Sequence, residues 1–242
     1  MLFPKLSLLL GFNNNLEHTY HMNDFQLKIT DCEKDIGVYM HSSLKPSYQV
    51  AEAVKKANRA LGILLRCLTY RDKFHYIRLY KTYVRCHLEY AVQAWSPWTK
   101  HDIDNIESVQ KRAIRCCHGL HGSTYEEKLS EVGLTTLFDR RQRGDMLETY
   151  KILNAIDDVD YHTWFSKVEE QHQITRGAVS ILADGTVVGA DNLVKPKSRL
   201  DIRKHFYSCR VIDPWNKLPN HVKKSGSVND FKINYDNYMA GK

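Results

Sequence analysis

The chain has 242 residues, 43% of them hydrophobic and 26% charged, and this composition excludes a wholly disordered protein. Its formal net charge of +7 and pI of about 9.0 favour anionic partners. No apolar run reaches membrane-spanning length, and the apolar N-terminus lacks the small residues of a signal-peptide cleavage site. The six scattered cysteines are typical of reduced thiols and not of a disulfide framework. We therefore expect an intracellular protein, nuclear or cytoplasmic, without a membrane partner.

Residues 1–44 have the pattern of short β-strands. An apolar run over 6–10 is followed by turn-forming residues. Phe25, Leu27 and Ile29 alternate with polar neighbours, as in a half-buried strand. Residues 36–40 predict one more strand.

Two long helices joined by a short turn are predicted between residues 46 and 98. Ser47 is a candidate N-cap for the first and Asp72 for the second, which Pro97 should end. Apolar residues recur at intervals of three and four, so each helix has one side suited to packing. The expected inward residues are Val50, Val54, Ala57, Leu61, Leu64 and Leu68 in the first helix, and Phe74, Ile77, Tyr80 or Tyr83, Val84 and Leu88 in the second.

The same pair of helices contains the charge excess of the whole chain. Between Lys45 and Tyr90 there are ten Lys or Arg residues and three Asp or Glu residues, a difference equal to the net charge of +7. Such a run is often no more than a solvated surface. Because tyrosines are interleaved with the basic residues, it also suggests a surface that meets phosphates.

Three more helices are predicted before residue 157. One covers 102–117, with Ile103, Ile106, Val109, Ala113 and Ile114 on one side. Thr124 and Glu127 fit a capping box that opens a short helix ending at Gly133. Thr135 or Thr136 should cap a longer helix to about residue 156. Its expected inward residues are Leu137, Leu147, Tyr150, Leu153 and Ile156.

The remaining chain has weaker patterns. Residues 183–186 have the sequence of a tight turn and suggest a small hairpin. Residues 199–218 look helical, but Pro214 should kink or end that helix. Ser227 begins a last helix with Phe231, Tyr235 and Tyr238 on one face. The predicted fold class is mainly α: short N-terminal strands, a helical bundle, then a looser C-terminal region with a hairpin and two helices.

Several ordered motifs resemble one family. Residues 33–38, EKDIGV, resemble the EKDLGV motif of non-LTR (LINE-type) retrotransposon polyproteins. Residues 51–113 are similar to the family's run of "AEAxKKANRxLG", "YRDK" and "HLEYxVQAWSP". Residues 140–145 (RRQRGD), 198–204 (SRLDIRK) and 215–219 (WNKLP) match further downstream motifs. The resemblance covers about residue 10 to the end of the chain.

The resemblance implies the thumb and downstream part of a reverse transcriptase, an RNA-directed DNA polymerase. It implies three domains: remnant strands of the palm edge (1–44), a basic helical thumb-like bundle (45–156) and a C-terminal extension (157–242). A thumb grips the template–primer duplex by its backbone, so the implied partners are RNA or an RNA–DNA duplex, together with the polymerase palm. The candidate phosphate-binding residues are Lys55, Lys56, Arg59, Arg66, Arg71, Lys73, Lys81 and Arg85. Tyr76 or Tyr83 packs on sugar or base in this interpretation, or else belongs to the core.

Polymerase chemistry requires carboxylates that hold two metal ions. In the family these lie in the palm, upstream of the EKDLGV motif, and no equivalent precedes Glu33 here. We therefore expect no catalytic residues, no polymerase activity from this chain as it stands, and Mg²⁺ only together with the palm.

Three local patterns resemble sites, but each has a simpler interpretation. Asp157-Asp158 resembles a polymerase signature but follows a helix. The thiols and imidazoles between residues 116 and 121 lack the separated ligand pairs of structural zinc. Cys86 and His87 are neighbours on a helix, so their side chains do not face each other. We expect no metal site.

Two other functions stay open. The chain could be a co-opted module that binds protein through an apolar helix face, or an inert relic of the element. A large exposed apolar patch, with the basic residues scattered over several faces, would favour the module.

Overall fold

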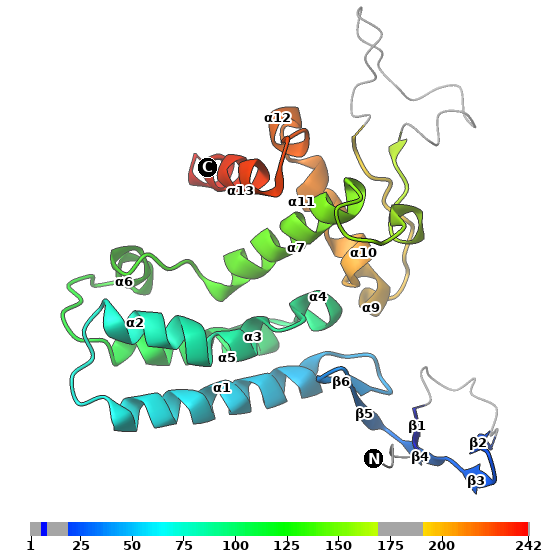
Figure 1. The fold of residues 1–242 in the computed structure, drawn as a ribbon, viewed down its shortest axis with the longest axis horizontal. Helices are drawn as coiled ribbons and strands as arrows, with labels where there is room; N and C mark the ends of the chain where they lie inside the picture. Colours follow the sequence, from blue (N-terminus) through cyan, green and yellow to red (C-terminus); the bar gives the residue numbers. More distant parts are fainter. Residues whose placement is uncertain (1–5, 9–18, 169–190, 242) are drawn as a thin grey trace, which may run out of the picture. The chain divides into compact units, whose positions relative to one another are not determined.

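The computed structural model describes residues 6–8, 19–168 and 191–241. Helices dominate, and short strands occur only before residue 42 in these ranges, so the predicted mainly α fold with N-terminal strands is confirmed. The chain divides into two compact units, residues 1–138 (unit 1) and 139–242 (unit 2) (Figure 1). This division lies between the boundaries at 44/45 and 156/157 that the sequence suggests.

The strands of unit 1 form three two-stranded ladders. β1 (Leu6–Leu8) is parallel to β4 (Lys28–Thr30), and the antiparallel pairs are β2 (His21–Met22) with β3 (Phe25–Gln26) and β5 (Cys32–Asp35) with β6 (Val38–His41). The half-buried strand expected at residues 25–29 is wrong, because Phe25 is 60% and Ile29 55% exposed. A two-stranded ladder offers few neighbours against which a face can be buried.

The β5–β6 hairpin sits against the helices through its turn. Ile36 and Gly37 both have positive φ angles, 42° and 85°, as a two-residue hairpin turn requires. The Tyr90 hydroxyl donates a hydrogen bond of 2.9 Å to the carbonyl of Ile36. A Cβ atom on Gly37 would lie 3.2 Å from the Tyr90 ring, so the close approach also favours glycine. In β6, two residues after the turn, the Tyr39 N–H donates to the Gln49 side chain of α1 at 2.9 Å.

The helices of unit 1 follow in chain order. They are α1 (Ser47–Cys67), α2 (His75–Leu79), the π-helical turn η1 (Tyr80–Val84), α3 (Cys86–Glu89), α4 (Val92–Trp95), α5 (Lys100–Arg115) and α6 (Tyr125–Glu131). Segments α2, η1 and α3 succeed one another along the chain as one helical stretch. The Arg85 N–H donates to the Tyr80 carbonyl at 3.0 Å, the i→i+5 bond of a π-turn.

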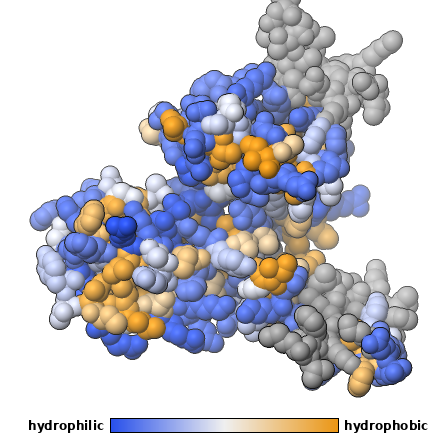
Figure 2. Space-filling model, in the orientation of Figure 1, coloured by the Kyte–Doolittle hydropathy of each residue, from blue (hydrophilic) through white to orange (hydrophobic). Residues whose placement is uncertain are grey.

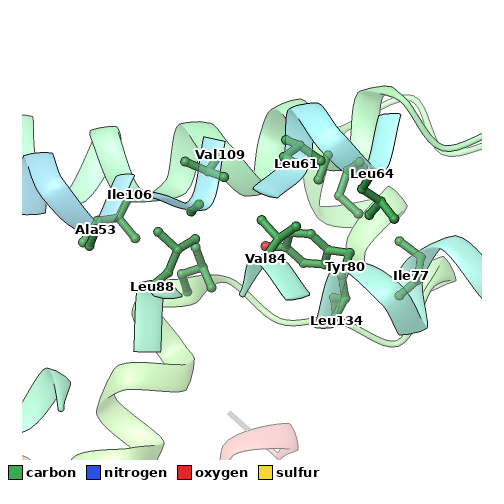
Figure 3. Packing of buried hydrophobic residues seen from close by; sticks show 14 of the residues in the cluster. Ala53, Leu61, Leu64, Ile77, Tyr80, Val84, Leu88, Ile106, Val109 and Leu134 are labelled. Atoms are coloured by element: carbon green, nitrogen blue, oxygen red, sulfur yellow. The ribbon is translucent and has the colours of Figure 1, made fainter. Parts of the chain in front are cut away.

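The core of unit 1 lies between α1, α5 and the α2–η1–α3 stretch (Figure 3). Leu61, Val84 and Ile106 are fully buried there, as their spacing predicts. Tyr80 takes the inward position that the sequence left open, whereas Tyr83 is 59% exposed. The expected inward place of Phe74 is wrong: it precedes the first turn of α2 and is 69% exposed.

Two predicted caps are confirmed. The Asp72 carboxylate accepts from the N–H groups of Phe74 and His75, both at 2.9 Å, and Thr124 with Glu127 forms the capping box of α6. The predicted Ser47 cap is wrong, because α1 begins at Ser47 itself and no side chain caps it.

The predicted end of the second long helix at Pro97 is also wrong. It ends at Glu89, followed by extended Tyr90 and by Ala91 in the left-handed region at φ 49°. The separate helix α4 comes between this break and Pro97.

Unit 2 is built on most of α7 (Leu137–Leu153). The other described elements are η2 (Tyr161–Thr163), α9 (Asp201–Lys204), α10 (Tyr207–Arg210), α11 (Ile212–Asn216), α12 (Asn220–Lys223) and α13 (Val228–Ala240). Its core centres on stacked aromatic rings: the Phe231 centroid lies 4.4 Å from that of Tyr150 and 6.1 Å from that of Trp215.

Two expectations for this region are corrected. Pro214 does not break a helix: it lies in the first turn of α11, where its missing N–H costs no bond, and the breaks precede it. Ile156 is half exposed, because α7 ends at Leu153. The last helix begins after Ser227 as predicted, with Phe231 and Tyr235 buried. The hairpin predicted at 183–186 lies outside the described residues. Within the described ranges, no helix could span a membrane.

Candidate nucleic-acid interface

Three of the eight candidate residues share one face of α1. Lys55, Arg59 and Arg66 are exposed and lie within about 40° of one another around the helix, since residues advance about 100° each. The buried residues of α1, such as Ala57 and Leu64, lie on the opposite side. We call Lys55, Arg59 and Arg66 the α1 basic face. In the described part of the chain, the one ion pair of these three residues joins Lys55 Nζ to Glu52 at 3.4 Å. This solvent-exposed contact contributes little stability.

Lys56 lies on the flank of α1. Its ammonium is 5.8 Å from the centre of the Tyr39 ring, and Lys34 of β5 lies 5.6 Å from the same centre. Lys56 therefore faces the β5–β6 hairpin and does not belong to the α1 basic face.

Arg71 joins two helix ends. Its Nε donates to the carbonyl of Cys116 at 2.9 Å and its Nη1 to the carbonyl of Leu68 at 3.1 Å, while Nη2 lies 3.2 Å from the His118 ring. Cys116 caps α5 and Leu68 caps α1. The guanidinium thus satisfies carbonyls that helix ends leave unpaired, and it positions the helices.

The other three candidates are separated from the α1 basic face. Lys73 pairs with Glu131 of α6 at 3.6 Å. Arg85 pairs with Glu89 one turn further along at 3.4 Å, with only 14% of its side chain exposed. Lys81, partly buried, lies one turn before Arg85. The eight residues do not form one surface.

Of the two candidate tyrosines, one is buried and one is exposed. Tyr76 is fully buried, and its hydroxyl donates to the carbonyl of Ala113 at 3.0 Å. Burial raises the pKa of Tyr76 well above its usual value. It is a core residue, while Tyr83 remains accessible to a ligand.

Sequence reasoning missed two arginines of α5. Arg112 and Arg115 are exposed, and with Asn58, Ser108 and Cys116 they line an open pocket of about 460 Å³ between α1 and α5. Both arginines fall between the apolar positions of α5, and this spacing was the signal in the sequence that could have identified them as exposed. Because acidic and basic residues balance outside residues 45–90, the net charge of that part of the chain did not single them out.

No grouping of three His, Cys, Asp or Glu side chains that could hold a metal ion occurs in the described part of the chain. Asp157 lies 3.7 Å from Lys151 in an ion pair, and Cys86 and His87 are exposed neighbours on α3. Burial raises the pKa of the Cys117 thiol, which makes it a poorer metal ligand. The carboxylates described here do not fit the Mg²⁺ site of a polymerase.

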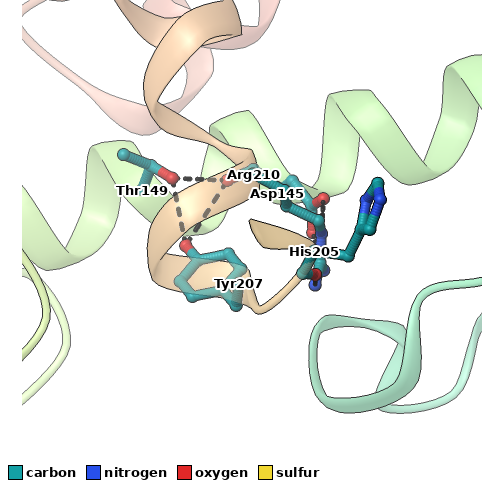
Figure 4. Close-up of polar contacts among 5 residues, drawn as sticks. All are labelled: Asp145, Thr149, His205, Tyr207 and Arg210. Carbon is teal, nitrogen blue, oxygen red and sulfur yellow. Dashed lines mark hydrogen bonds and ion pairs between the residues drawn. The ribbon is translucent and has the colours of Figure 1, made fainter. Parts of the chain in front are cut away.

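Unit 2 contains a buried polar group of its own (Figure 4). Arg210 donates two hydrogen bonds of 2.9 Å to the Asp145 carboxylate, and the Tyr207 hydroxyl lies 3.0 Å from the Thr149 hydroxyl. Burial raises the pKa of Asp145, while the hydrogen bond and charge of Arg210 act to lower it. These contacts join α7 to α10, so their role is to hold unit 2 together.

Exposed apolar side chains are the last surface feature of unit 1. Ile63, Tyr70 and Phe74 are each at least half exposed. On the face that Figure 2 shows, hydrophobic residues gather where the C-terminal half of α1 runs beside the α2–η1 stretch, with hydrophilic residues around them.

Comparisons with known proteins identify no family for this chain. A scan against family models, a search of curated proteins and a search of solved structures each gave no match.

Proposed function

We propose that this chain is the thumb and downstream part of a retrotransposon-type reverse transcriptase, and that the α1 basic face binds the phosphate backbone of RNA or an RNA–DNA duplex. The motif resemblance supports the family. The observation that carries the binding proposal is the α1 basic face itself, three exposed cations on one side of a 21-residue helix. An intracellular location, nuclear or cytoplasmic, accords with such a partner.

The expected binding is electrostatic and independent of sequence. Phosphates on a duplex are regularly spaced, and a long basic helix can contact several of them without reading bases. Because each neutralised phosphate releases counterions, affinity should fall steeply with salt. We assign no metal-dependent step to these residues and propose no polymerase activity for the chain as it stands.

A titration of the 242-residue chain with a labelled 20-base-pair RNA–DNA hybrid tests the proposal. Fluorescence anisotropy between 50 and 200 mM salt should give a linear loss of log affinity with log salt. Changing Lys55, Arg59 and Arg66 to Gln should reduce the slope by about 3, close to one unit per lost contact.

A matched control removes the same charge from exposed sites in unit 2, namely Lys197→Gln, Arg199→Gln and Lys217→Gln. An equal loss in both triple variants would indicate a bulk charge effect and refute the α1 face as the site. Absence of any binding at 50 mM salt would refute the proposal as a whole.

A protein-interaction module is the second candidate. Its support is the exposed apolar set of Ile63, Tyr70 and Phe74, together with the spread of Arg71, Lys73 and Arg85 away from the α1 basic face. This candidate predicts that changing Ile63 and Phe74 to Ser abolishes a partner contact while hybrid affinity stays unchanged.

A further inference from the structure

The groove between α1 and α5 has two cationic residues on its α5 side. Arg112 and Arg115 lie one helical turn apart on the side of α5 away from its buried residues. Arg112 Nη1 lies 3.3 Å from Asn58 Oδ1 of α1, which places its guanidinium across the groove. The five residues that line the pocket include no carboxylate.

The two walls of the groove are fixed relative to each other. Near the N-terminal ends of both helices, the Ser47 hydroxyl donates to Asp102 at 2.7 Å. At the other end, Arg71 binds the carbonyls that follow both α1 and α5. The pocket, which Cys116 also lines, lies next to this second link. A preformed site needs little ordering when a ligand binds.

The α1 wall continues the α1 basic face. Asn58, Gly62 and Arg66 follow one another at intervals of four and form one row of the helix, and Lys55 lies one turn before Asn58, beside that row. A Cβ atom on Gly62 would meet nothing within 4 Å. The surface of α1 one turn beyond Asn58 is thus open at Gly62, and it leads from the pocket towards Arg66.

We infer that this groove is a phosphate-binding site, in which Arg112 and Arg115 hold the phosphodiester backbone of the nucleic acid that the α1 basic face binds. The inference rests on the proposed function and extends it to residues of a second helix. A guanidinium presents a planar set of donors that matches two phosphate oxygens. The open shape and the continuity with Lys55 and Arg66 favour a polymer backbone over an isolated anion.

The first test is the same hybrid titration with Arg112→Gln and Arg115→Gln combined. We expect the salt slope to fall by about 2 and the affinity at 100 mM salt to fall at least tenfold. The matched control is Lys100→Gln with Lys111→Gln: both lysines are exposed on α5, carry the same charge and do not line the pocket.

The outcomes separate the two proposals. Equal losses in the arginine and lysine variants, or no loss in the arginine variant, would overturn the groove site while the α1 basic face stands. If the α1 triple variant binds as the unchanged chain does and the arginine variant does not, the groove stands and the α1 basic face fails as the site. No binding by the unchanged chain overturns both.

A second test uses Cys116 as a reporter inside the pocket. Alkylation by N-ethylmaleimide, followed peptide by peptide with mass spectrometry, should slow at Cys116 when saturating hybrid is present. The exposed Cys86 of α3 is the internal control and should react at an unchanged rate. Equal protection of both thiols, or of neither, contradicts binding in the groove.

Inorganic pyrophosphate at the same phosphate concentration gives the last comparison. We expect it to leave the Cys116 rate unchanged, because it cannot use the cations along α1. Protection by pyrophosphate as strong as that by the hybrid would assign the pocket to small phosphates and overturn the nucleic-acid assignment.

Discussion

The hydroxyl of Ser47 donates a 2.7 Å hydrogen bond to the carboxylate of Asp102, and this contact joins the first turn of α1 to the first turn of α5. The same carboxylate oxygen accepts from the Thr99 hydroxyl at 2.8 Å, while Thr99 caps α5 by accepting from the Asp102 N–H. Asp102 is 3% exposed. One buried side chain thus links the N-terminal ends of the two helices that border the groove.

Asp102→Ala should therefore destabilise unit 1 by about 1–3 kcal/mol, because it removes the shared acceptor and leaves two hydroxyl groups without their partner. Urea unfolding followed by circular dichroism measures the change. Asp104→Ala, an exposed site on the same helix, is the control and should stay within about 0.5 kcal/mol of the unchanged chain. Equal midpoints for the two variants would contradict a structural role for Asp102.

Gly62→Ala should stabilise unit 1 by about 0.5–1 kcal/mol. Glycine inside a helix loses more backbone entropy than alanine, and the space around Gly62 is open. Gly119→Ala is the contrasting variant: its surroundings are equally open, but its φ of 74° lies in the left-handed region, so alanine there should destabilise. Thermal unfolding of both variants tests the pair. Destabilisation by Gly62→Ala would indicate an unfavourable contact that the structure does not contain.

Much of the helical framework could be predicted from the sequence, because burial along α1 and α5 follows the spacing of residues such as Leu61 and Ile106. Caps such as Asp72 were predictable because their partners lie two or three residues away. Contacts between residues that are far apart in the sequence were not predictable. Nothing in the neighbourhood of Arg71 indicates that its guanidinium would bind the carbonyl of Cys116, 45 residues further on.

The candidate site shows the same limit. Lys55, Arg59 and Arg66 could be named as candidates because they belong to one helix, but the sequence did not separate them from Lys56 and the other candidates. Periodicity could not bring Arg112 beside Asn58, because that requires the packing of α5 against α1. The exposure of Phe74 depends on where α2 begins, and the inward place of Tyr80 comes with a π-turn that no apolar repeat encodes.

The capping box of α6 should make stability depend on pH in the acidic range. Hydrogen bonds from the N–H groups of Thr124 and Ser123 hold the pKa of Glu127 below its usual value of 4.5. A carboxyl group with a lowered pKa in the folded state adds stability above its unfolded pKa and loses it as the pH falls through the folded pKa. The contribution should thus be complete near pH 6 and should decline below about 4.5.

Glu127→Gln removes that titration. The unfolding midpoint of the variant in urea should lie below that of the unchanged chain at pH 6, and the gap should narrow as the pH falls below 4.5. Glu126→Gln on the same turn is the control, because Glu126 makes neither of these hydrogen bonds. A gap that stays constant between pH 6 and pH 3 would refute the assignment.

Two ion pairs made by residues of α7, Asp145 with Arg210 and Arg143 with Asp236, should differ strongly in their contribution to unit 2. Asp145 and Arg210 form a nearly buried bidentate pair, with 9% and 15% of their side chains exposed. Arg143 and Asp236 form an equally direct pair at 2.6 and 2.8 Å, but with 32% and 52% exposed. The two pairs thus have similar hydrogen-bond geometry but differ in how deeply they are buried.

Asp145→Ala should destabilise unit 2 by about 3–5 kcal/mol, because it leaves the Arg210 charge buried without its partner. Asp236→Ala should cost less than about 1 kcal/mol, because solvent screens the exposed pair. The double change Asp145→Ala with Arg210→Leu should recover part of the first loss, since it removes the uncompensated charge. Urea unfolding of the three variants, with tryptophan fluorescence including that of Trp215 in the unit 2 core, measures these differences. An equal loss of unfolding free energy in Asp145→Ala and Asp236→Ala would contradict the conclusion that burial determines how much each ion pair contributes.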